Sequence, residues 1–178
     1  MARGLKPTAA SAYGILWDTN KENWIIPIRD PYSNALMGWQ EKGHRSRYFR
    51  NYPTGVRKSM SVFGHGLYEG GDMIVVESPL DAVRLRSVGV MGGVALYGAI
   101  PSREQLNIIR GADRIIFALD NDDTGRSSSL NLAKMSFSHN FDAWFFDYTH
   151  TDQKDIGDRK STRLNSSHSS VSRMPSSA

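Results

Sequence analysis

Closely spaced carboxylates follow a short apolar run near the middle of the chain. Residues 115–119 are apolar and include β-branched and aromatic side chains, which is typical of a strand buried on both faces. They lead directly into Asp120-Asn121-Asp122. Alternate residues of an extended segment point the same way, so we expect the two aspartate side chains on one side. Two carboxylates placed in this way can hold a hard cation such as Mg²⁺.

A third carboxylate follows another apolar run. Residues 73–76 predict a buried strand that ends at Glu77. Since the carboxyl ends of parallel strands meet at one edge of a sheet, we expect Glu77 beside Asp120 and Asp122. Such a group would hold Mg²⁺ for phosphoryl transfer, and Glu77 could alternatively serve as a general acid or base. Asp81 fits the first turn of a helix, where it interacts with the dipole or leans toward the cation.

Helical patterns separate the apolar runs and must position these side chains. We predict strands at 73–76, 94–97, 115–119 and 141–146, and helices at 79–88, after Ser102, and at 124–137. This alternation predicts an α/β domain over 71–157, with a four-stranded parallel sheet flanked by helices.

The first part of the chain has a different pattern. Strands at 24–28 and 35–40 around a turn at 30–34 predict a hairpin, and we assign residues 1–70 to a small lobe of mixed α+β structure. A basic run with interleaved aromatic residues follows the hairpin, over 41–58. This run favours binding of a single-stranded nucleic acid through backbone charge and base stacking; the alternative is a solvated loop.

The last residues have a composition unlike the rest. Residues 158–178 are rich in Ser and lack periodic apolar residues, and they resemble the translated sequence of a common short-read sequencing adapter. We expect this segment to be disordered, and the natural product to be longer than this chain. The segment holds four of the 22 basic and one of the 18 acidic residues, so residues 1–157 carry 18 basic and 17 acidic side chains. The net charge of the whole chain is therefore no argument for nucleic-acid binding.

Several other functions are excluded or weakened. The chain has no cysteine, which excludes disulfides and thiolate zinc sites and favours the cytoplasm. No apolar stretch reaches membrane-spanning length. An EF-hand would need an acidic residue where Asn131 stands. A phosphatase of the haloacid dehalogenase type also begins with Asp-x-Asp-x-Thr, but its strand normally comes early, and Gly125 stands where an apolar residue is usual.

Taken together, the motifs resemble those of the Toprim domain of DnaG-type DNA primases, particularly phage forms. The resemblance rests on the segments 76–81, 97–99 and 118–126, and on Lys154-Asp155-Ile156-Gly157, where Ile156 replaces a usual proline. Upstream, the segments 26–31, 47–51, 57–59 and 63–64 resemble the lobe that precedes the Toprim domain in these primases.

The resemblance implies Mg²⁺-dependent (or Mn²⁺-dependent) synthesis of RNA primers on single-stranded DNA from ribonucleoside triphosphates, with a replicative helicase as partner. Because the chain has no cysteine, we expect no zinc. It implies catalytic magnesium bound by Glu77, Asp120 and Asp122, with Asp81 and Asp155 nearby. It also implies a nucleic-acid and nucleotide groove lined by Arg47, Tyr48, Arg50, Arg57 and Lys58. The alternatives are a Toprim nuclease and a non-catalytic nucleic-acid-binding protein; a topoisomerase would need a further domain for its nucleophilic tyrosine.

Overall fold

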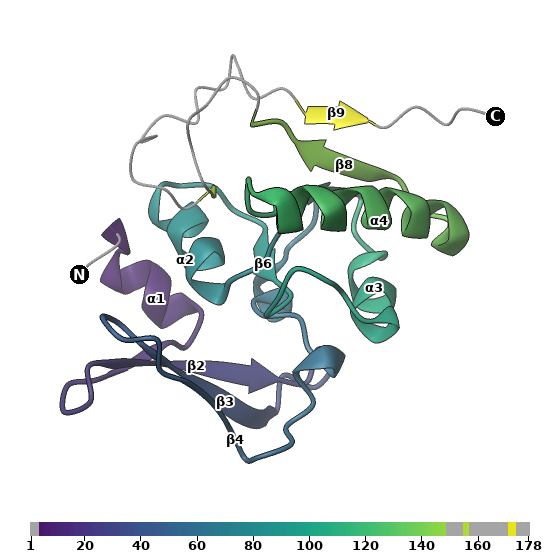
Figure 1. The fold of residues 1–178 in the computed structure, drawn as a ribbon. Helices are drawn as coiled ribbons and strands as arrows, with labels where there is room; N and C mark the ends of the chain where they lie inside the picture. The colour runs from purple at the N-terminus through teal and green to yellow at the C-terminus, as the bar shows by residue number, and fades with distance from the viewer. Residues whose placement is uncertain (1–3, 149–154, 157–170, 174–178) are drawn as a thin grey trace.

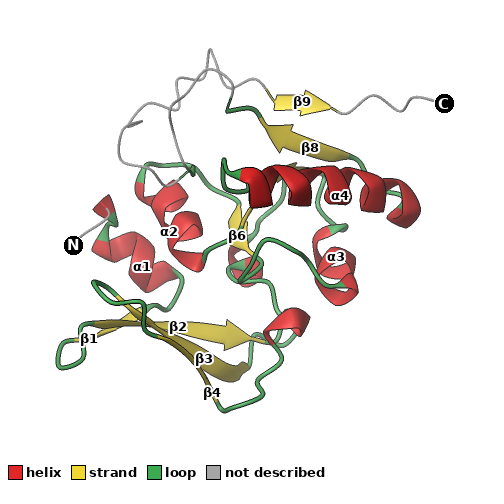
Figure 2. Ribbon diagram, viewed as in Figure 1, coloured by secondary structure: helices red, strands yellow, loops and turns green. Residues whose placement is uncertain are grey.

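The protein is built on two sheets that lie one above the other in Figures 1 and 2. The computed structural model describes residues 4–148, 155–156 and 171–173. Within these residues, no helix is long and apolar enough to cross a membrane. The two sheets differ in type: the N-terminal one is antiparallel, and the second is built mainly from parallel strands.

The N-terminal sheet follows a short helix, α1 (Pro7–Ala12). Its strands are β1 (Leu16–Asp18), β2 (Asn23–Arg29), β3 (Leu36–Gly43) and β4 (Phe49–Tyr52), in the order β1-β2-β3-β4. The predicted hairpin is confirmed as β2 and β3. Neither α1 nor β1 was predicted. Part of the basic run forms β4 and pairs with β3, so this part of the run is a strand and not a loop.

The second sheet contains the predicted parallel strands. They are β5 (Asp72–Val76), β6 (Gly93–Ala95), β7 (Arg114–Phe117) and β8 (Ala143–Phe146), in the order β6-β5-β7-β8. The helices are α2 (Pro79–Ser87), α3 (Arg103–Ile109) and α4 (Asp123–His139). Buried residues of α3 and α4 pack on one face of this sheet and those of α2 on the other. The α/β prediction with a four-stranded parallel sheet is therefore confirmed.

A short fifth strand extends this sheet at its edge. β9 (Val171–Arg173) pairs antiparallel with β8, although we predicted the whole segment 158–178 to be disordered. The physical reason is that an edge strand such as β8 presents unpaired backbone groups, which any extended segment can satisfy. The other residues of that segment lie outside the described part of the chain.

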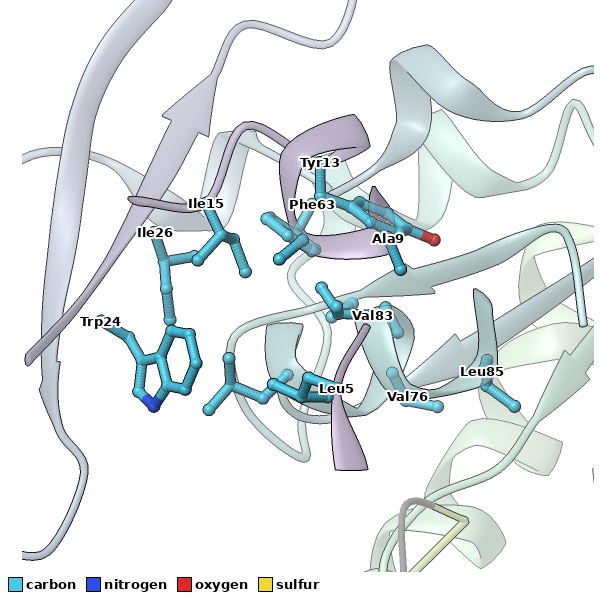
Figure 3. Packing of buried hydrophobic residues seen from close by; sticks show 14 of the residues in the cluster. Leu5, Ala9, Tyr13, Ile15, Trp24, Ile26, Phe63, Val76, Val83 and Leu85 are labelled. Carbon is cyan, nitrogen blue, oxygen red and sulfur yellow. The ribbon is translucent and has the colours of Figure 1, made fainter. Parts of the chain in front are cut away.

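One hydrophobic core joins the N-terminal sheet to the parallel sheet. Ile26 and Ile28 of β2 are fully buried, and they belong to the same cluster as Val76, Leu80 and Val83 from β5 and α2. Figure 3 shows part of this packing, with side chains from both halves of the chain directed at one another. The two sheets are therefore held in a fixed relation by a shared apolar interior.

The connection between the sheets is anchored by a buried polar residue. The segment contains two short 3-10 turns, η2 (Lys58–Met60) and η3 (His65–Leu67). The Gln105 amide nitrogen donates to the carbonyl oxygens of Ser61 at 2.8 Å and Leu96 at 2.9 Å, and to that of Lys58 at 3.3 Å. Since Gln105 begins α3 in a capping box with Ser102, the connector is tied directly to the parallel sheet.

Candidate active site

Glu77 and Asp120 meet at the carboxyl edge of the parallel sheet. Glu77 directly follows β5 and Asp120 lies three residues beyond β7, the strand that pairs with β5. The backbone N–H of Asp120 donates to a carboxylate oxygen of Glu77 at 3.1 Å. The loops after two neighbouring strands are thereby joined, which is the arrangement that their spacing in the sequence predicts.

Asp122 begins the helix that follows. One of its carboxylate oxygens accepts from the backbone N–H of Gly125 at 2.8 Å, and its carbonyl oxygen accepts from the N–H of Arg126 at 2.9 Å. These are the contacts of a helix N-cap residue. Asp122 thus has a structural role in starting α4 as well as a position beside the other carboxylates, and the positive end of the helix dipole favours its charge.

The close packing of residue 125 on the Asp120 backbone explains why a glycine stands at this position. A β-carbon at this position would lie 1.8 Å from the carbonyl oxygen of Asp120, far inside any allowed contact. The first turn of α4 can therefore pack on the Asp120 backbone only if residue 125 has no side chain. This glycine holds Asp120 and Asp122 in one compact turn.

The electrostatics of the edge are clearest at Glu77, which is partly buried. Burial raises the pKa of the Glu77 carboxyl above its ordinary value. The hydrogen bond from the Asp120 N–H acts in the opposite direction, and the charges of Asp120 and Asp122 raise this pKa further. The negative charges of the three carboxylates therefore repel one another, and a bound cation would stabilise each of them.

Tyr148 lies beside the same group and was not predicted. Burial raises its pKa, and the charges of four acids raise it further: Asp155, Asp120, Asp81 and Glu77. These interactions place Asp81 and Asp155 near the edge occupied by Glu77 and Asp120. Tyr148 and Asp120 also line one side of a cavity of about 370 Å³ between α4 and β8. Sequence offered no signal for this tyrosine, which follows β8 without a motif of its own.

The donor set suits a hard cation, although the side chains do not yet enclose one. All five candidates carry carboxylate oxygens, the ligands that Mg²⁺ prefers: Glu77, Asp81, Asp120, Asp122 and Asp155. Among the described residues, no three His, Cys, Asp or Glu side chains converge as ligands of a single ion would. The chemistry of the donors and their mutual repulsion fit a magnesium site, and their assignment as ligands is a proposal.

Two lysines from the N-terminal half reach the same edge. The Lys42 ammonium contacts the Ser78 hydroxyl at 3.4 Å, directly after Glu77. The Lys58 ammonium donates to the Tyr97 carbonyl oxygen at 3.2 Å, beyond the end of β6, and it also lies 5.4 Å from the centre of the Phe49 ring. Positive charge from β3 and from the connector thus lies at the same edge of the parallel sheet as the carboxylates.

The residues predicted to line a nucleic-acid groove do not all lie together. Lys58 is at the carboxylate edge, whereas Tyr48 and Arg50 contact Glu41 and Tyr52, respectively. Because Lys42 pairs with Phe49 and Glu41 pairs with Arg50, alternation places these two pairs on opposite faces of the sheet. Arg47 and Arg57 are exposed in the segments that flank β4.

Lys42 and Phe49 are additional candidates on the face toward the carboxylates. Both lie within the basic run that the sequence had indicated. The signal that could have singled them out is the two-residue alternation of β3 and β4, because it would have placed them on one face with Lys58 nearby. It was missed because the run is charged on both faces and was read as one stretch.

Comparison with known proteins agrees with this geometry. Residues 71–147 match the family described as "Toprim domain". The chain is 32% identical over 126 residues to a DNA primase of Borreliella burgdorferi, covering 65% of this chain and 24% of the relative. It is 30% identical over 122 residues to a DNA primase of Neisseria meningitidis, covering 64% of this chain and 21% of the relative. The chain therefore spans about a quarter of the length of these relatives.

Solved structures resemble the fold over most of the chain. The primase fragment of the bacteriophage T7 primase-helicase aligns with a TM-score of 0.70 at 19% identity, covering 88% of this chain and 66% of that structure. The DnaG primase catalytic domain bound to single-stranded DNA aligns with a TM-score of 0.69 at 18% identity, covering 87% and 63%. The likeness includes the N-terminal sheet, because a match of this extent exceeds residues 71–147.

Proposed function

Because residues 71–147 of this chain form a Toprim domain of the type found in DnaG primases, we propose that the protein is the catalytic part of a DNA primase. It would join ribonucleotides into a primer on a single-stranded DNA template. A replicative helicase would be its partner and would supply that template. The observation that carries this proposal is the meeting of Glu77 and Asp120 at one sheet edge, where Lys42 and Lys58 contact Ser78 and Tyr97.

The carboxylates have the role of binding metal in this proposal. Glu77, Asp120 and Asp122 would hold Mg²⁺ or Mn²⁺, and Asp81 and Asp155 would add negative charge around it. When bound, the metal neutralises phosphate charge and orients the phosphate oxygens. The helix cap at Asp122 and the hydrogen bond between Asp120 and Glu77 keep these side chains in place before substrate arrives.

The lysines have the complementary role of binding the substrate phosphates. In primer extension, the 3′-hydroxyl oxygen of the growing strand bonds to the α-phosphorus of a nucleoside triphosphate. The bond from that phosphorus to the β-phosphate oxygen breaks, pyrophosphate leaves, and the hydroxyl proton passes to solvent. Lys58 and Lys42 would attract the triphosphate and template to the carboxylate edge, where positioning supplies much of the rate. Arg47 and Arg57 would add basic charge along the path to it.

The test compares the chain with its Asp120→Asn, Asp122→Asn double variant. A single-stranded template with one label is incubated with Mg²⁺ and ribonucleoside triphosphates that carry a second label, and the products are separated on a gel. We expect primers from the wild type and none from the double variant, and Mn²⁺ binding followed by electron paramagnetic resonance should be lost in parallel. Glu104→Gln, on the exposed first turn of α3, is the matched charge control.

Three outcomes would count against this assignment. Full primer synthesis by the double variant would remove the aspartates from the site. Shortening of the labelled strand in place of extension would make the protein a Toprim nuclease. Binding of the template without any Mg²⁺-dependent product would make it a nucleic-acid-binding module.

A further inference from the structure

A second cavity lies where the end of α1, the end of β2 and the connector meet. It has a volume of about 310 Å³, and residues of the segments 11–14, 27–34 and 62–67 line it together with Tyr97. Among the described residues of its wall, none is a candidate metal ligand, and neither Lys42 nor Lys58 lines it. The cavity is therefore separate from the carboxylate site, and its size is at the lower end of the range for small-molecule sites.

Glycines keep this cavity open. Gly14, Gly64 and Gly66 all line it. Gly64 has a φ of +79°, and a β-carbon there would clash with the Tyr13 ring, so only a glycine allows this close approach. A β-carbon on Gly14 would lie 3.7 Å from an Nη atom of Arg29, which is an ordinary contact. The Arg29 guanidinium therefore borders the space that a side chain at position 14 would occupy.

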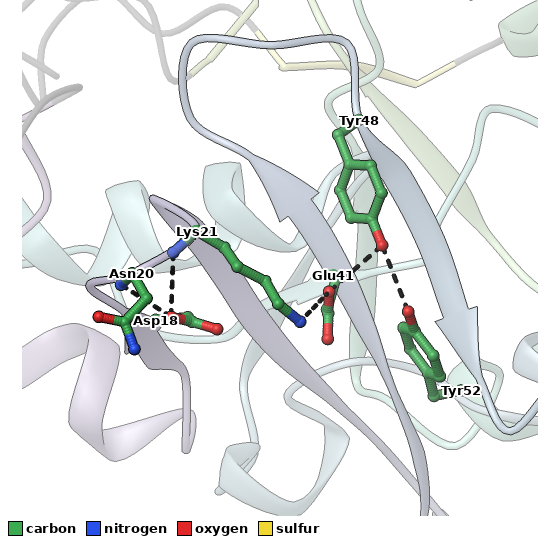
Figure 4. Close-up of polar contacts among 6 residues, drawn as sticks. All are labelled: Asp18, Asn20, Lys21, Glu41, Tyr48 and Tyr52. Atoms are coloured by element: carbon green, nitrogen blue, oxygen red, sulfur yellow. Dashed lines mark hydrogen bonds and ion pairs between the residues drawn. The ribbon is translucent and has the colours of Figure 1, made fainter.

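The charge of Arg29 has no acidic partner, in contrast to that of an acid on the same sheet. Glu41 of β3 lies between two partners (Figure 4): its carboxylate pairs with the Lys21 ammonium at 3.7 Å and accepts from the Tyr48 hydroxyl at 3.3 Å. The Arg29 guanidinium donates to the carbonyl oxygen of Asn34 at 3.0 Å. Within the described part of the chain, no acid forms an ion pair with it.

The neighbouring acid, Asp30, also lines the cavity but is engaged in the turn that follows β2. One of its carboxylate oxygens accepts from the Ser33 N–H at 2.8 Å, the Ser33 hydroxyl at 2.9 Å and the Tyr32 N–H at 3.1 Å. The hydrogen bonds from Ser33, followed by that from Tyr32, lower the pKa of Asp30 below its ordinary value. The turn thus offsets the charge of Asp30, and Arg29 can attract an anion from solution.

Two further polar side chains border the cavity. His65 has its Nδ1 atom 3.3 Å from the Pro31 carbonyl oxygen. Because a carbonyl can only accept, Nδ1 carries the proton in the neutral ring, and Nε2 is left to accept from a ligand hydroxyl. The Asn34 amide lies nearby, since its Oδ1 atom would be 3.3 Å from a β-carbon on Gly66. The wall therefore combines a cation, an acceptor and an amide.

We propose that this cavity binds a small hydroxylated phosphate monoester of the sugar-phosphate class. An exposed arginine alone is an ordinary surface residue, but Arg29 stands on a cavity wall without an acid to compensate it. Its guanidinium presents parallel N–H donors that match phosphate oxygens. A phosphate has three terminal oxygens and can accept from Arg29 and from the Asn34 amide together, whereas a carboxylate has two. The Nε2 atom of His65 would accept from a hydroxyl of the sugar.

The test follows binding of ribose 5-phosphate in EDTA, which removes metal-dependent binding at the carboxylates. The ¹⁵N-labelled 178-residue chain is titrated by NMR, and isothermal titration calorimetry gives the dissociation constant. We expect saturable shifts of the Gly64 and Gly66 amide signals. Loss of the charged hydrogen bonds in Arg29→Gln should weaken binding about 10- to 150-fold, and loss of a neutral one in His65→Phe about 2- to 10-fold.

Two variants are matched charge controls. Lys58→Gln removes a positive charge from the carboxylate edge, and Arg110→Gln removes one from the exposed end of α3; both should bind ribose 5-phosphate as the wild type does. Two probes divide the ligand: ribose should give no saturable shift, and inorganic phosphate should bind more weakly than ribose 5-phosphate because it has no sugar hydroxyl for His65.

Several results would overturn this site. Unchanged binding by Arg29→Gln would do so, and so would equal weakening by Lys58→Gln, which would place the ligand at the carboxylate edge. In the wild type alone, shifts confined to the residues that follow β5 and β7 would have the same meaning, so the test does not depend on the folding of a variant. Equally tight binding of gluconate, which carries a carboxylate in place of the phosphate, would exclude a phosphate site.

Discussion

The candidate functional side chains occupy different positions in the two sheets. In the parallel sheet, the candidate functional groups follow the strands: Glu77 comes directly after β5, and Asp120 and Asp122 come a few residues after β7. In the antiparallel sheet they lie on the strands themselves and are divided between two faces. Lys42 and Phe49 face the carboxylates, whereas Glu41 and Arg50 point to the opposite side.

The difference follows from burial. A parallel sheet covered by helices on both faces has apolar strands throughout, so polar groups can gather only where the strands end. An antiparallel sheet with one open face keeps polar residues at alternate positions. The acidic edge is thus compact and sensitive to small displacements, while the basic sheet should tolerate substitution better. Substitutions at the acidic edge and at the connection between the two sheets test this difference in sensitivity.

The largest effect is expected at the acidic edge, from Gly125→Ala. A glycine in a helix normally gains stability on substitution by alanine, but here the new β-carbon would lie 1.8 Å from the Asp120 carbonyl oxygen. The turn must open by more than an ångström, so we expect primer synthesis to fall by about 100-fold or more and the unfolding free energy by about 3 kcal/mol.

The matched control for this substitution is Gly111→Ala, where a β-carbon would meet its nearest atom at 3.9 Å. It should leave both activity and stability within experimental error. Urea denaturation and the primer gel assay measure the two quantities. A fully active Gly125→Ala variant would show that the Asp120 turn is not constrained by the first turn of α4.

The contrast between the sheets also explains which structural features could be predicted from the sequence. The runs before Glu77 and Asp120 are apolar throughout and are followed by helix starts, so strands, helices and the acidic edge all follow from the pattern. The strand order β6-β5-β7-β8 does not, because it depends on how the helices pack. The role of Gly125 could not be read either, since a close backbone contact leaves no trace in a single sequence.

The N-terminal sheet was less predictable for physical reasons. β1 has three residues and α1 has six, too few for a periodic signal. β4 carries Arg50 and Asn51 between aromatic residues, so both its faces are polar or amphipathic and the alternation is hidden. Tyr48 and Arg50 were therefore grouped with Lys58, from which the sheet separates them. The pairing of β3 with β4 shows which residues share a face.

The connection between the two regions gives an intermediate effect. Gln105 is 2% exposed and its amide nitrogen bonds to carbonyl groups on the connector and beyond β6. Gln105→Leu keeps the volume but removes the Gln105 donor from the buried carbonyls of Ser61 and Leu96, which costs about 2–4 kcal/mol of unfolding free energy. Lys58, on the same connector, should lose its position, so the Michaelis constant for nucleotides should rise.

Asn107→Leu is the control for Gln105, because it lies on the exposed side of the same helix and should change stability by no more than about 0.5 kcal/mol. Both variants are compared by urea denaturation. Equal stability of the two would mean that the amide contacts of Gln105 do not hold the sheets together.

The smallest effect is expected from Glu77→Gln, and its sign depends on pH. Burial and the neighbouring aspartates raise the pKa of Glu77 in the folded state above its value in the unfolded chain. The folded state therefore binds the proton more tightly, and wild-type stability falls as pH rises through the interval between the two values. Glutamine cannot ionise and keeps an oxygen for the Asp120 N–H, so the variant should be more stable at pH 7. The gain should stay below about 1 kcal/mol because the carboxyl is only partly buried and solvent screens its charge.

At pH 4, below the ordinary pKa of a glutamate, the carboxyl is mostly protonated in both states, so the difference between Glu77→Gln and wild type should nearly vanish. Thermal unfolding in EDTA at pH 4 and pH 7 measures it, with the exposed Glu69→Gln as control for a lost charge elsewhere. A variant less stable than wild type at pH 7 would mean that the ionised Glu77 carboxylate is stabilised by its surroundings in the folded state and not destabilised by the charges of Asp120 and Asp122. The acidic edge would then need no cation to offset its charge, and its contrast with the basic sheet would lose its electrostatic basis.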